Sequence, residues 1–317
     1  MSDYLSRYSD KKQDELERDV AKVYRQAQHD MWDKLQGYIK RYERIDESKR
    51  QQVADGKISQ AEYDEWKRRR VFNGEQWLRQ RKAISHVLTE ADRQAANIIN
   101  NGTLDVFKEA ANYSAYDIEQ NTRGAVSFDL YDKTTVTRLI ADKPELLPRR
   151  VVDGKKADAW HTREISNAIA QGIIQGESIP DLAKRIARDT GIQADNSATR
   201  YARTAMTGAQ NSGRVERMEE AQEMGIEIRK RWLATLDSRT RDEHGQLDGQ
   251  EVPVDEPFVV DGKEIMFPGD PNCPHGELVW GCRCTLINVY PKYQHLKQTH
   301  FTSYDEWKNG KVKNIKE

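Results

Sequence analysis

The chain has 317 residues and a formal net charge of −1, with 32% charged and 37% hydrophobic residues. This balance gives no global argument for binding DNA or a membrane surface, and no apolar run approaches the roughly 20 residues that cross a bilayer. With a mean hydropathy of −0.92, the chain is polar for a compact globule. Such a composition favours long, largely solvated helices, or a protein that folds fully only in an assembly.

The N-terminus and the cysteine content point to a reducing compartment. The opening stretch MSDYLSRYSDKKQDELERD contains no apolar segment of the kind found in secretory signals. The chain has three cysteines, all between 270 and 284, and an odd number favours reduced thiols or metal ligands over a disulfide framework. We therefore expect a protein that resides in a cytoplasm or is assembled there.

Two early segments carry apolar residues at helical spacing. The first runs from about 10 to 44, and its apolar stripe comprises Val20, Tyr24, Met31 and Leu35. The second runs from about 74 to 120, and Asn101-Gly102 is expected to break or kink it, because glycine is unfavourable inside a helix. The pattern predicts an antiparallel helical hairpin or bundle arm, with a partner-binding coiled coil as the alternative.

The segment from about 121 to 156 is less regular and ends in a connector, KPELLPRRVVDGKK. Helical patterns return after it. They cover residues 162–176, 178–191 and 196–225, and glycines follow or end each one. We expect a compact set of three helices here.

The apolar period changes to two after Gly225. The run 226–236 reads as a strand in which Lys230 is the exception, and 258–267 reads as a hairpin turning at Asp261-Gly262. Residues 284–290 form another expected strand, and a short helix is expected near 303–309.

These patterns predict an α+β protein: a mostly helical N-terminal region with long helices, then a domain of helices plus a small antiparallel sheet. The predicted divisions are a helical N-terminal arm at 1–150, a mixed domain at 151–290 and a C-terminal tail at 291–317.

Chemistry-bearing residues gather in the stretch that follows the first strand. It holds Asp237, Arg239, Arg241, Asp242, Glu243, His244 and Asp248. A solvated connection is the ordinary interpretation of such a stretch. The density of His, Asp and Arg just before the cysteine segment favours a functional loop instead.

The three cysteines suggest a metal site, because zinc takes four thiolate or imidazole ligands. The candidates are Cys273, Cys282 and Cys284 with His244 or His275. The Cys282-Arg283-Cys284 spacing requires the backbone to turn at Arg283 if both thiols are to reach one metal. Burial as small apolar residues, a disulfide from Cys273 after release into an oxidising medium, and a nucleophilic thiol with His244 as its base remain open.

A nuclease is the enzymatic alternative. His244, Asp248, Asn272 and His275 loosely resemble the residues with which HNH endonucleases cleave phosphodiesters using a metal. Those motifs lie on a hairpin followed by a helix, whereas Pro274 and Gly276 flank His275 here and a strand is expected to follow.

One long run resembles the phage Mu F-like minor head protein (phage head morphogenesis) family of tailed bacteriophages. The resemblance covers roughly 160–290, with the densest motifs at 232–286. The positions that match in order are Trp232, Asp237, Arg239, Arg241, His244, Leu247, Asp248, Gly249, Pro268, Gly269, Cys282, Arg283 and Cys284. Gly281 stands where the family usually has Asn, and Cys273 lies outside the pattern.

The resemblance implies a structural minor capsid component at the portal vertex, inside the virion after assembly in the host cytoplasm. Expected partners are the portal protein and the major capsid or scaffolding protein, with roles in procapsid assembly and in DNA packaging or ejection. No enzyme activity is expected, although related domains occur fused to toxin enzymes. Neither a small-molecule substrate nor a membrane is expected, and the basic runs at 67–70 and 229–231 could contact DNA phosphates non-specifically.

Within that domain we predict two sites. Asp237, Arg239, Arg241 and Asp248 are expected to form a structural polar network that fixes the long loops. His244, Cys282 and Cys284 are expected to bind structural zinc, with Cys273 or His275 as the fourth ligand. The metal-dependent nuclease or hydrolase acting on phage DNA remains the alternative function.

Overall fold

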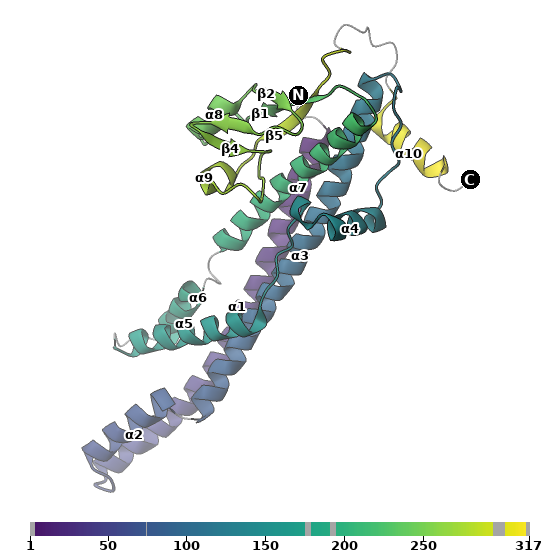
Figure 1. Cartoon of the computed structure of the whole chain (residues 1–317). Coiled ribbons are helices and arrows are strands. Elements are labelled where there is room, and N and C mark those ends of the chain that lie inside the picture. Colours follow the sequence, from purple (N-terminus) through teal and green to yellow (C-terminus); the bar gives the residue numbers. More distant parts are fainter. Residues whose placement is uncertain (1–3, 74, 175–178, 191–194, 294–301, 315–317) are drawn as a thin grey trace. The chain divides into compact units, whose positions relative to one another are not determined.

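A computed structural model describes residues 4–73, 75–174, 179–190, 195–293 and 302–314, and Figure 1 shows the whole chain. Helices dominate, and the strands are confined to the region between 229 and 289. The helices are α1 (Tyr4–Ala54), α2 (Gln60–Asn73), α3 (Glu75–Asn121), α4 (Lys133–Asp142), the 3-10 turn η1 (Pro144–Leu146), α5 (Gly154–Ile174), α6 (Ile179–Asp189), α7 (Asp195–Glu223), α8 (Asp242–Leu247), α9 (Gly276–Val279) and α10 (Tyr304–Asn314). The strands are β1 (Arg229–Leu233), β2 (Glu251–Pro253), β3 (Phe258–Val260), β4 (Lys263–Ile265) and β5 (Thr285–Val289). The α+β prediction is confirmed.

The chain forms two compact units, and the long helices α1 and α3 each contribute to both. Unit 1 consists of residues 1–17, 98–150 and 199–317, and unit 2 consists of 18–97 and 151–198. The predicted domain boundaries at 150 and 290 follow the chain rather than these units, and they stay a prediction.

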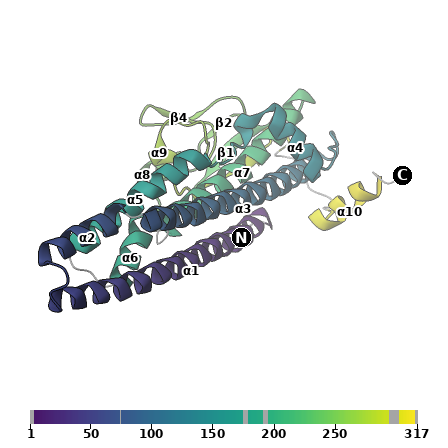
Figure 2. The same cartoon turned by 90° about the horizontal axis from the view of Figure 1, so that it is seen from below.

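Unit 2 is a helical assembly with a continuous apolar core. Its parts of α1 and α3 lie side by side and antiparallel, as Figures 1 and 2 show, and Tyr24 Oη donates to Asp92 Oδ1 at 2.9 Å. Side chains from α1, α3, α5 and α6 meet in the core. Its buried members are Met31, Leu35, Ile84, Leu88, Ile165, Ala168, Ile169, Ile186 and Ala187. The predicted antiparallel hairpin is therefore present, and its apolar stripe is the face that packs.

In unit 1, α3 continues through Asn101-Gly102, so the expected break is absent. A Cβ added to Gly102 would lie 2.5 Å from Leu16 Cδ1 of α1. The missing side chain lets the two helices approach closely here, and this packing compensates for the low helix propensity of glycine.

The strands of unit 1 form two small antiparallel sheets rather than the single one expected. β1 is the central strand of the first sheet, in the order β2-β1-β5, and it pairs Trp232 with Leu286. β3 and β4 form the second sheet, joined by Asp261 and Gly262, both of which have positive φ. This geometry confirms the predicted Asp-Gly hairpin. Figure 1 shows α7 running beside these strands.

Lys230 breaks the apolar pattern of β1 but is fully buried among its apolar neighbours. Its Nζ donates to the backbone oxygen of Val254 at 2.8 Å and lies 5.4 Å from the centre of the Phe258 ring. Burial lowers the pKa of Lys230 to about 8, because the apolar surroundings disfavour the charged form.

The expected C-terminal helix exists as α10, which packs against α1 and α3 within unit 1. The Tyr304 ring lies 4.9 Å from that of Tyr4 and 5.2 Å from that of Tyr113. Trp307 Nε1 donates to Glu119 Oε2 at 2.6 Å. Aromatic and charged contacts therefore attach this helix to the unit.

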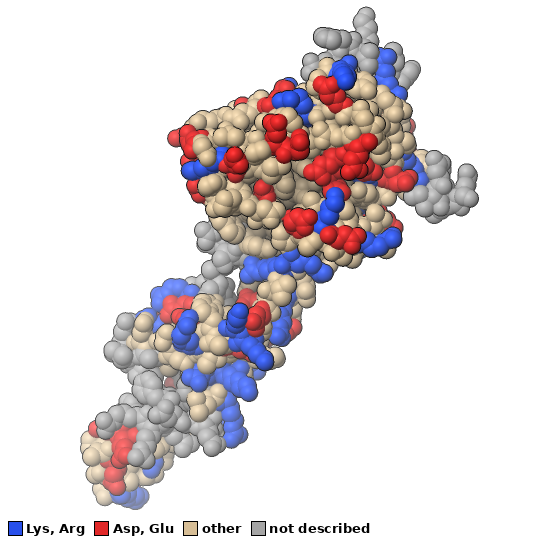
Figure 3. Space-filling view, viewed as in Figure 1, with Lys and Arg blue, Asp and Glu red and all other residues tan. Residues whose placement is uncertain are grey.

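The two units differ in charge. Unit 2 has 24 Lys and Arg against 20 Asp and Glu, whereas unit 1 has 27 against 32. On the face shown in Figure 3, Asp and Glu form clusters on unit 1. In the described part of the chain no helix has an apolar stretch long enough to span a bilayer.

Candidate metal centre

His244 is placed by α8, a short helix where the sequence suggested an irregular loop. Leu247 on the same face is fully buried and anchors the helix in the core. The His244 ring is 3% exposed and meets the Trp232 ring edge-on, with 5.9 Å between their centres. This packing fixes the position of the imidazole.

Cys282 and Cys284 lie in the bend that leads into β5, and α7 holds that bend in place. Thr207 Oγ1 donates to the Cys282 backbone oxygen at 2.9 Å, and Asn211 Nδ2 donates to the Cys284 backbone oxygen at 3.3 Å. Because the strand begins only at Thr285, the backbone is free to turn at Arg283, as the Cys-x-Cys spacing requires.

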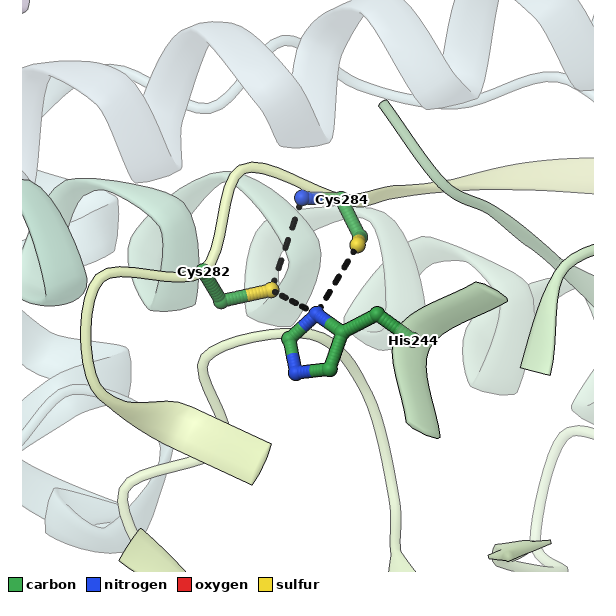
Figure 4. A group of neighbouring side chains, drawn as sticks. All are labelled: His244, Cys282 and Cys284. Carbon is green, nitrogen blue, oxygen red and sulfur yellow. Dashed lines mark hydrogen bonds between the residues drawn. The ribbon is translucent and has the colours of Figure 1, made fainter. Parts of the chain in front are cut away.

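These three side chains converge on one point, shown in Figure 4. His244 Nδ1 lies 3.3 Å from Cys284 Sγ and 3.6 Å from Cys282 Sγ. The Cys284 amide donates to Cys282 Sγ at 3.4 Å. One ligand atom from each residue lies within 4.8 Å of the others, and all three residues are buried.

The spacing of these atoms fits a tetrahedral metal. With Zn–N near 2.0 Å and Zn–S near 2.3 Å, tetrahedral ligands place N and S about 3.5 Å apart and the two S atoms about 3.8 Å apart. The observed N···S distances of 3.3 and 3.6 Å match this requirement. The cluster can therefore hold a metal ion through one imidazole and two thiolates.

The pKa values of the two thiols are shifted in opposite directions. A hydrogen bond from Cys282 lowers the pKa of Cys284, and the contact with His244 lowers it further. The same thiol–thiol contact, together with burial, raises the pKa of Cys282. The first thiolate thus forms readily, and a bound cation would favour the second.

Cys273 and His275 lie outside this cluster. Cys273 Sγ donates to the backbone oxygens of Glu264 at 3.5 Å and His275 at 3.8 Å, and His275 directly precedes α9. Among the described residues, the group able to hold a metal contains neither. All three cysteines are free thiols, with no disulfide between them.

Asp237 is paired chiefly with an arginine that the predicted network omitted. Arg283 donates to its two carboxylate oxygens at 2.6 and 2.7 Å, whereas Arg239 Nη2 lies 3.5 Å from one of them. The hydrogen bonds from Arg283 hold the pKa of Asp237 well below its usual range. The pair fixes the residue between the two cysteines to the loop after β1.

Arg241 and Asp248 hold backbone groups rather than each other. Arg241 donates to the backbone oxygens of Glu277, at 3.0 Å, and Trp280. Asp248 Oδ1 accepts from the Ala234 amide at 2.8 Å. Of the four predicted network residues, Asp237 and Arg239 contact each other, whereas Arg241 and Asp248 each hold backbone groups of neighbouring loops.

Asn211 on α7 was not predicted, although it organises this region. Its Nδ2 donates to the Pro268 backbone oxygen at 3.0 Å, and its Oδ1 accepts from the Leu286 amide at 2.9 Å. The side chain is fully buried. Its place on the buried face of a helix was the only available sequence signal.

The small braced sheet, packed against a long helix and carrying the His and Cys cluster, forms a compact α+β module. Residues 163–287, which include the whole cluster, match the family described as phage Mu protein F like protein. The match covers less than half of the chain and agrees with the resemblance seen in the sequence motifs.

Two curated relatives were found. One is the NAD(+)–arginine ADP-ribosyltransferase EFV of Enterococcus faecalis, 31% identical over 209 residues, which are 62% of this chain and 42% of that protein. The other is the minor head protein GP7 of Bacillus phage SPP1, 30% identical over 178 residues, which are 56% of each. The chain thus spans about half the length of these relatives. No solved structure matches it.

The first of these relatives corrects the expectation that no enzyme activity accompanies this sequence. A protein named as an ADP-ribosyltransferase is 31% identical to more than half of the chain. The expectation relied on association with a structural family, and that association does not separate head proteins from enzymes that share the region.

Proposed function

We propose that the chain is a minor head protein of a tailed phage, built into the virion as a structural component. The observation that carries the proposal is the match of residues 163–287 to the Mu F-like family. The resemblance to a named minor head protein over 178 residues supports it. A minor head protein would have capsid-related partners.

The finer proposal is a location inside the capsid near the portal vertex, reached during procapsid assembly in the host cytoplasm. The portal protein is the proposed direct partner, with the major capsid or scaffolding protein as neighbours. A role in DNA packaging or ejection would follow from that location. The long helices of unit 2, with their largely polar outer faces, offer an extended surface for such contacts.

Non-specific DNA contact belongs to the same proposal, and the two basic runs support it to different extents. Unit 2 carries the excess of Lys and Arg. Arg231, in the second basic run, is paired with Glu251, and Arg229 donates to the backbone oxygen of the same residue. The run at 67–70 lies on α2, and its side chains are outside the described residues.

We also propose that His244, Cys282 and Cys284 bind zinc in a structural role. Soft thiolate ligands with an imidazole suit zinc. The ion would tie α8 to the bend before β5 and so stabilise the connections of this small sheet.

Co-expression of the full chain with the portal, scaffolding and capsid proteins of its phage tests the head-protein proposal. The chain should be recovered in purified procapsids in few copies, and leaving out the portal protein should abolish its incorporation. Procapsids that contain the chain equally with and without portal protein would contradict portal association. Absence of the chain from every particle would contradict the function itself.

A second assay distinguishes the structural proposal from the alternative of a metal-dependent nuclease. Purified chain loaded with Zn²⁺ or Mg²⁺ is incubated with plasmid DNA, beside His244→Ala. The structural proposal expects intact DNA in both reactions. Cleavage by the unmodified chain that His244→Ala abolishes would favour the nuclease.

A further inference from the structure

The proposed metal centre has three ligands from the described residues, whereas tetrahedral zinc takes four. Neither predicted fourth ligand, Cys273 or His275, belongs to this group. Both carboxylate oxygens of Asp237 accept hydrogen bonds from Arg283. The Cys273 thiol donates to backbone oxygens outside the cluster. One coordination position is therefore not filled by these side chains.

A cavity borders the cluster at Cys284. Its volume is about 660 Å³, and its walls come from α1, α7, the end of β1 and the residues around Cys284, all within unit 1. Polar and apolar groups line it in similar measure. A ligand of a few atoms can therefore enter beside the cluster without displacing the core.

Three arginines line the cavity, and their charges are neutralised to different extents by acidic partners. Arg203 is paired with Glu17 at 2.9 Å, and Arg283 is paired with Asp237. Arg239 makes a looser contact of 3.5 Å with the same aspartate and is mostly exposed. Its charge is thus the least neutralised of the three.

Other lining groups set the polarity of the cavity. Ser9 is 8% exposed, and its Oγ has no hydrogen-bond partner among the described residues. Asp10 also lines the cavity, and burial raises the pKa of its carboxyl. The wall therefore carries a carboxyl group beside a hydroxyl that has no hydrogen-bond partner among the described residues.

We propose that a metal held by His244, Cys282 and Cys284 keeps its fourth position for a ligand from outside the protein, which a small anion reaches through this cavity. The inference rests on the metal centre proposed above. A divalent ion with two thiolates and one imidazole is formally neutral, so attraction for the anion comes from the arginine side of the cavity. Metal sites with three protein ligands are the kind that leave the fourth position exchangeable.

Cobalt substitution with azide as the probe tests the inference on the full chain. Co²⁺ bound by two thiolates should show sulfur-to-metal charge-transfer bands and tetrahedral visible bands. Adding azide should shift the visible bands in a saturable manner while the charge-transfer bands persist. Bands that form but do not respond to azide would overturn the open position alone. Failure to form any thiolate–cobalt bands would overturn the metal centre as well.

Two variants locate the anion. Arg239→Gln should weaken azide binding about twofold to fivefold, in line with one partly exposed charge. Arg138→Gln, which changes an exposed arginine on α4 away from the cavity wall, should leave it unchanged. Equal azide affinity in the unmodified chain and both variants would show that azide does not bind in this cavity.

Cys273→Ser tests the competing fourth ligand. The proposal expects the cobalt spectrum and the azide response of this variant to equal those of the unmodified chain. A changed spectrum before azide is added would show that Cys273 completes the site and would overturn the open position.

Discussion

Unit 2 and the sheet region of unit 1 both have apolar cores, but the sheet region also relies on single polar side chains that hold its backbone. In unit 2, apolar side chains from four helices share one core, so the stabilisation is spread over many similar contacts. In the sheet region, single polar residues such as Asn211, Arg241 and Asp248 each hold particular backbone groups. The sheet region therefore depends on particular polar residues as well as on its apolar pattern, whereas the core of unit 2 depends mainly on that pattern.

The largest effect is expected for Asn211→Ala. The substitution leaves the Leu286 amide and the Pro268 and Cys284 oxygens without their side-chain partner, inside the protein. With about 1–3 kcal/mol for each unsatisfied buried group, partly relieved by relaxation, we expect a loss of about 3–5 kcal/mol. Urea unfolding followed by tryptophan fluorescence measures it. Asn309→Ala, on the exposed face of α10, should change stability little, and an equal loss in both variants would contradict the bracing role.

In unit 2, Ile165→Ala should cost about 2–4 kcal/mol, because it leaves a cavity in a packed core. Thermal unfolding followed by circular dichroism measures the change. Lys155→Ala, on the exposed side of α5, is the matched control. A loss below about 1 kcal/mol at Ile165 would show that this core is not close-packed.

Lys230 should make stability depend on alkaline pH. Its pKa in the folded chain is lowered to about 8 from an ordinary 10.5. Between these values the unfolded chain binds more protons, so the free energy of unfolding should rise with pH, by up to about 3 kcal/mol. Urea unfolding at pH 8, 9 and 10 measures the slope, and Lys230→Met should remove it. A slope that persists in the variant would assign the effect to another group.

Asp237 should make the free energy of unfolding depend on acid pH, with a smaller effect than that of Lys230. Because Arg283 lowers the pKa of Asp237 in the folded chain, its stabilisation is present above the ordinary aspartate pKa and is lost as pH falls below it. The comparison is urea unfolding of the unmodified chain and Asp237→Asn at pH 6, 5, 4 and 3. The variant should be less stable at pH 6, and the difference should shrink toward pH 3. A difference independent of pH would contradict the ionic origin.

The sequence predicted the elements whose apolar residues recur at a regular spacing. Apolar spacing located the long hairpin and its packed face, a period of two located β1 and β5, and Asp261-Gly262 located the hairpin turn. The break at Gly102 was predicted wrongly, because local propensity could not reveal that Leu16 packs against this glycine. Propensity describes the isolated helix, and tertiary packing decided the outcome.

The sequence predicted the site residues that belong to a recognisable motif. It did not predict contacts between residues that lie far apart in the chain. His244, Cys282 and Cys284 converge as the motif suggested. The sequence marked Lys230 only as an exception in its strand and Asn211 only by its place on a helix, because the partners of a buried polar side chain are backbone groups from distant segments. Arg283 was noticed only as part of a motif, and its pairing with Asp237 needed the fold.

Metal content of the purified chain tests the central claim about the braced sheet most directly. Elemental analysis after dialysis should find one zinc per chain in the unmodified protein and in Cys273→Ser, and none in Cys282→Ser or Cys284→Ser. Removing zinc with a chelator should lower the midpoint of thermal unfolding of the first two proteins only. Metal-free protein with freely titrating thiols, or equal zinc in all four proteins, would contradict the claim.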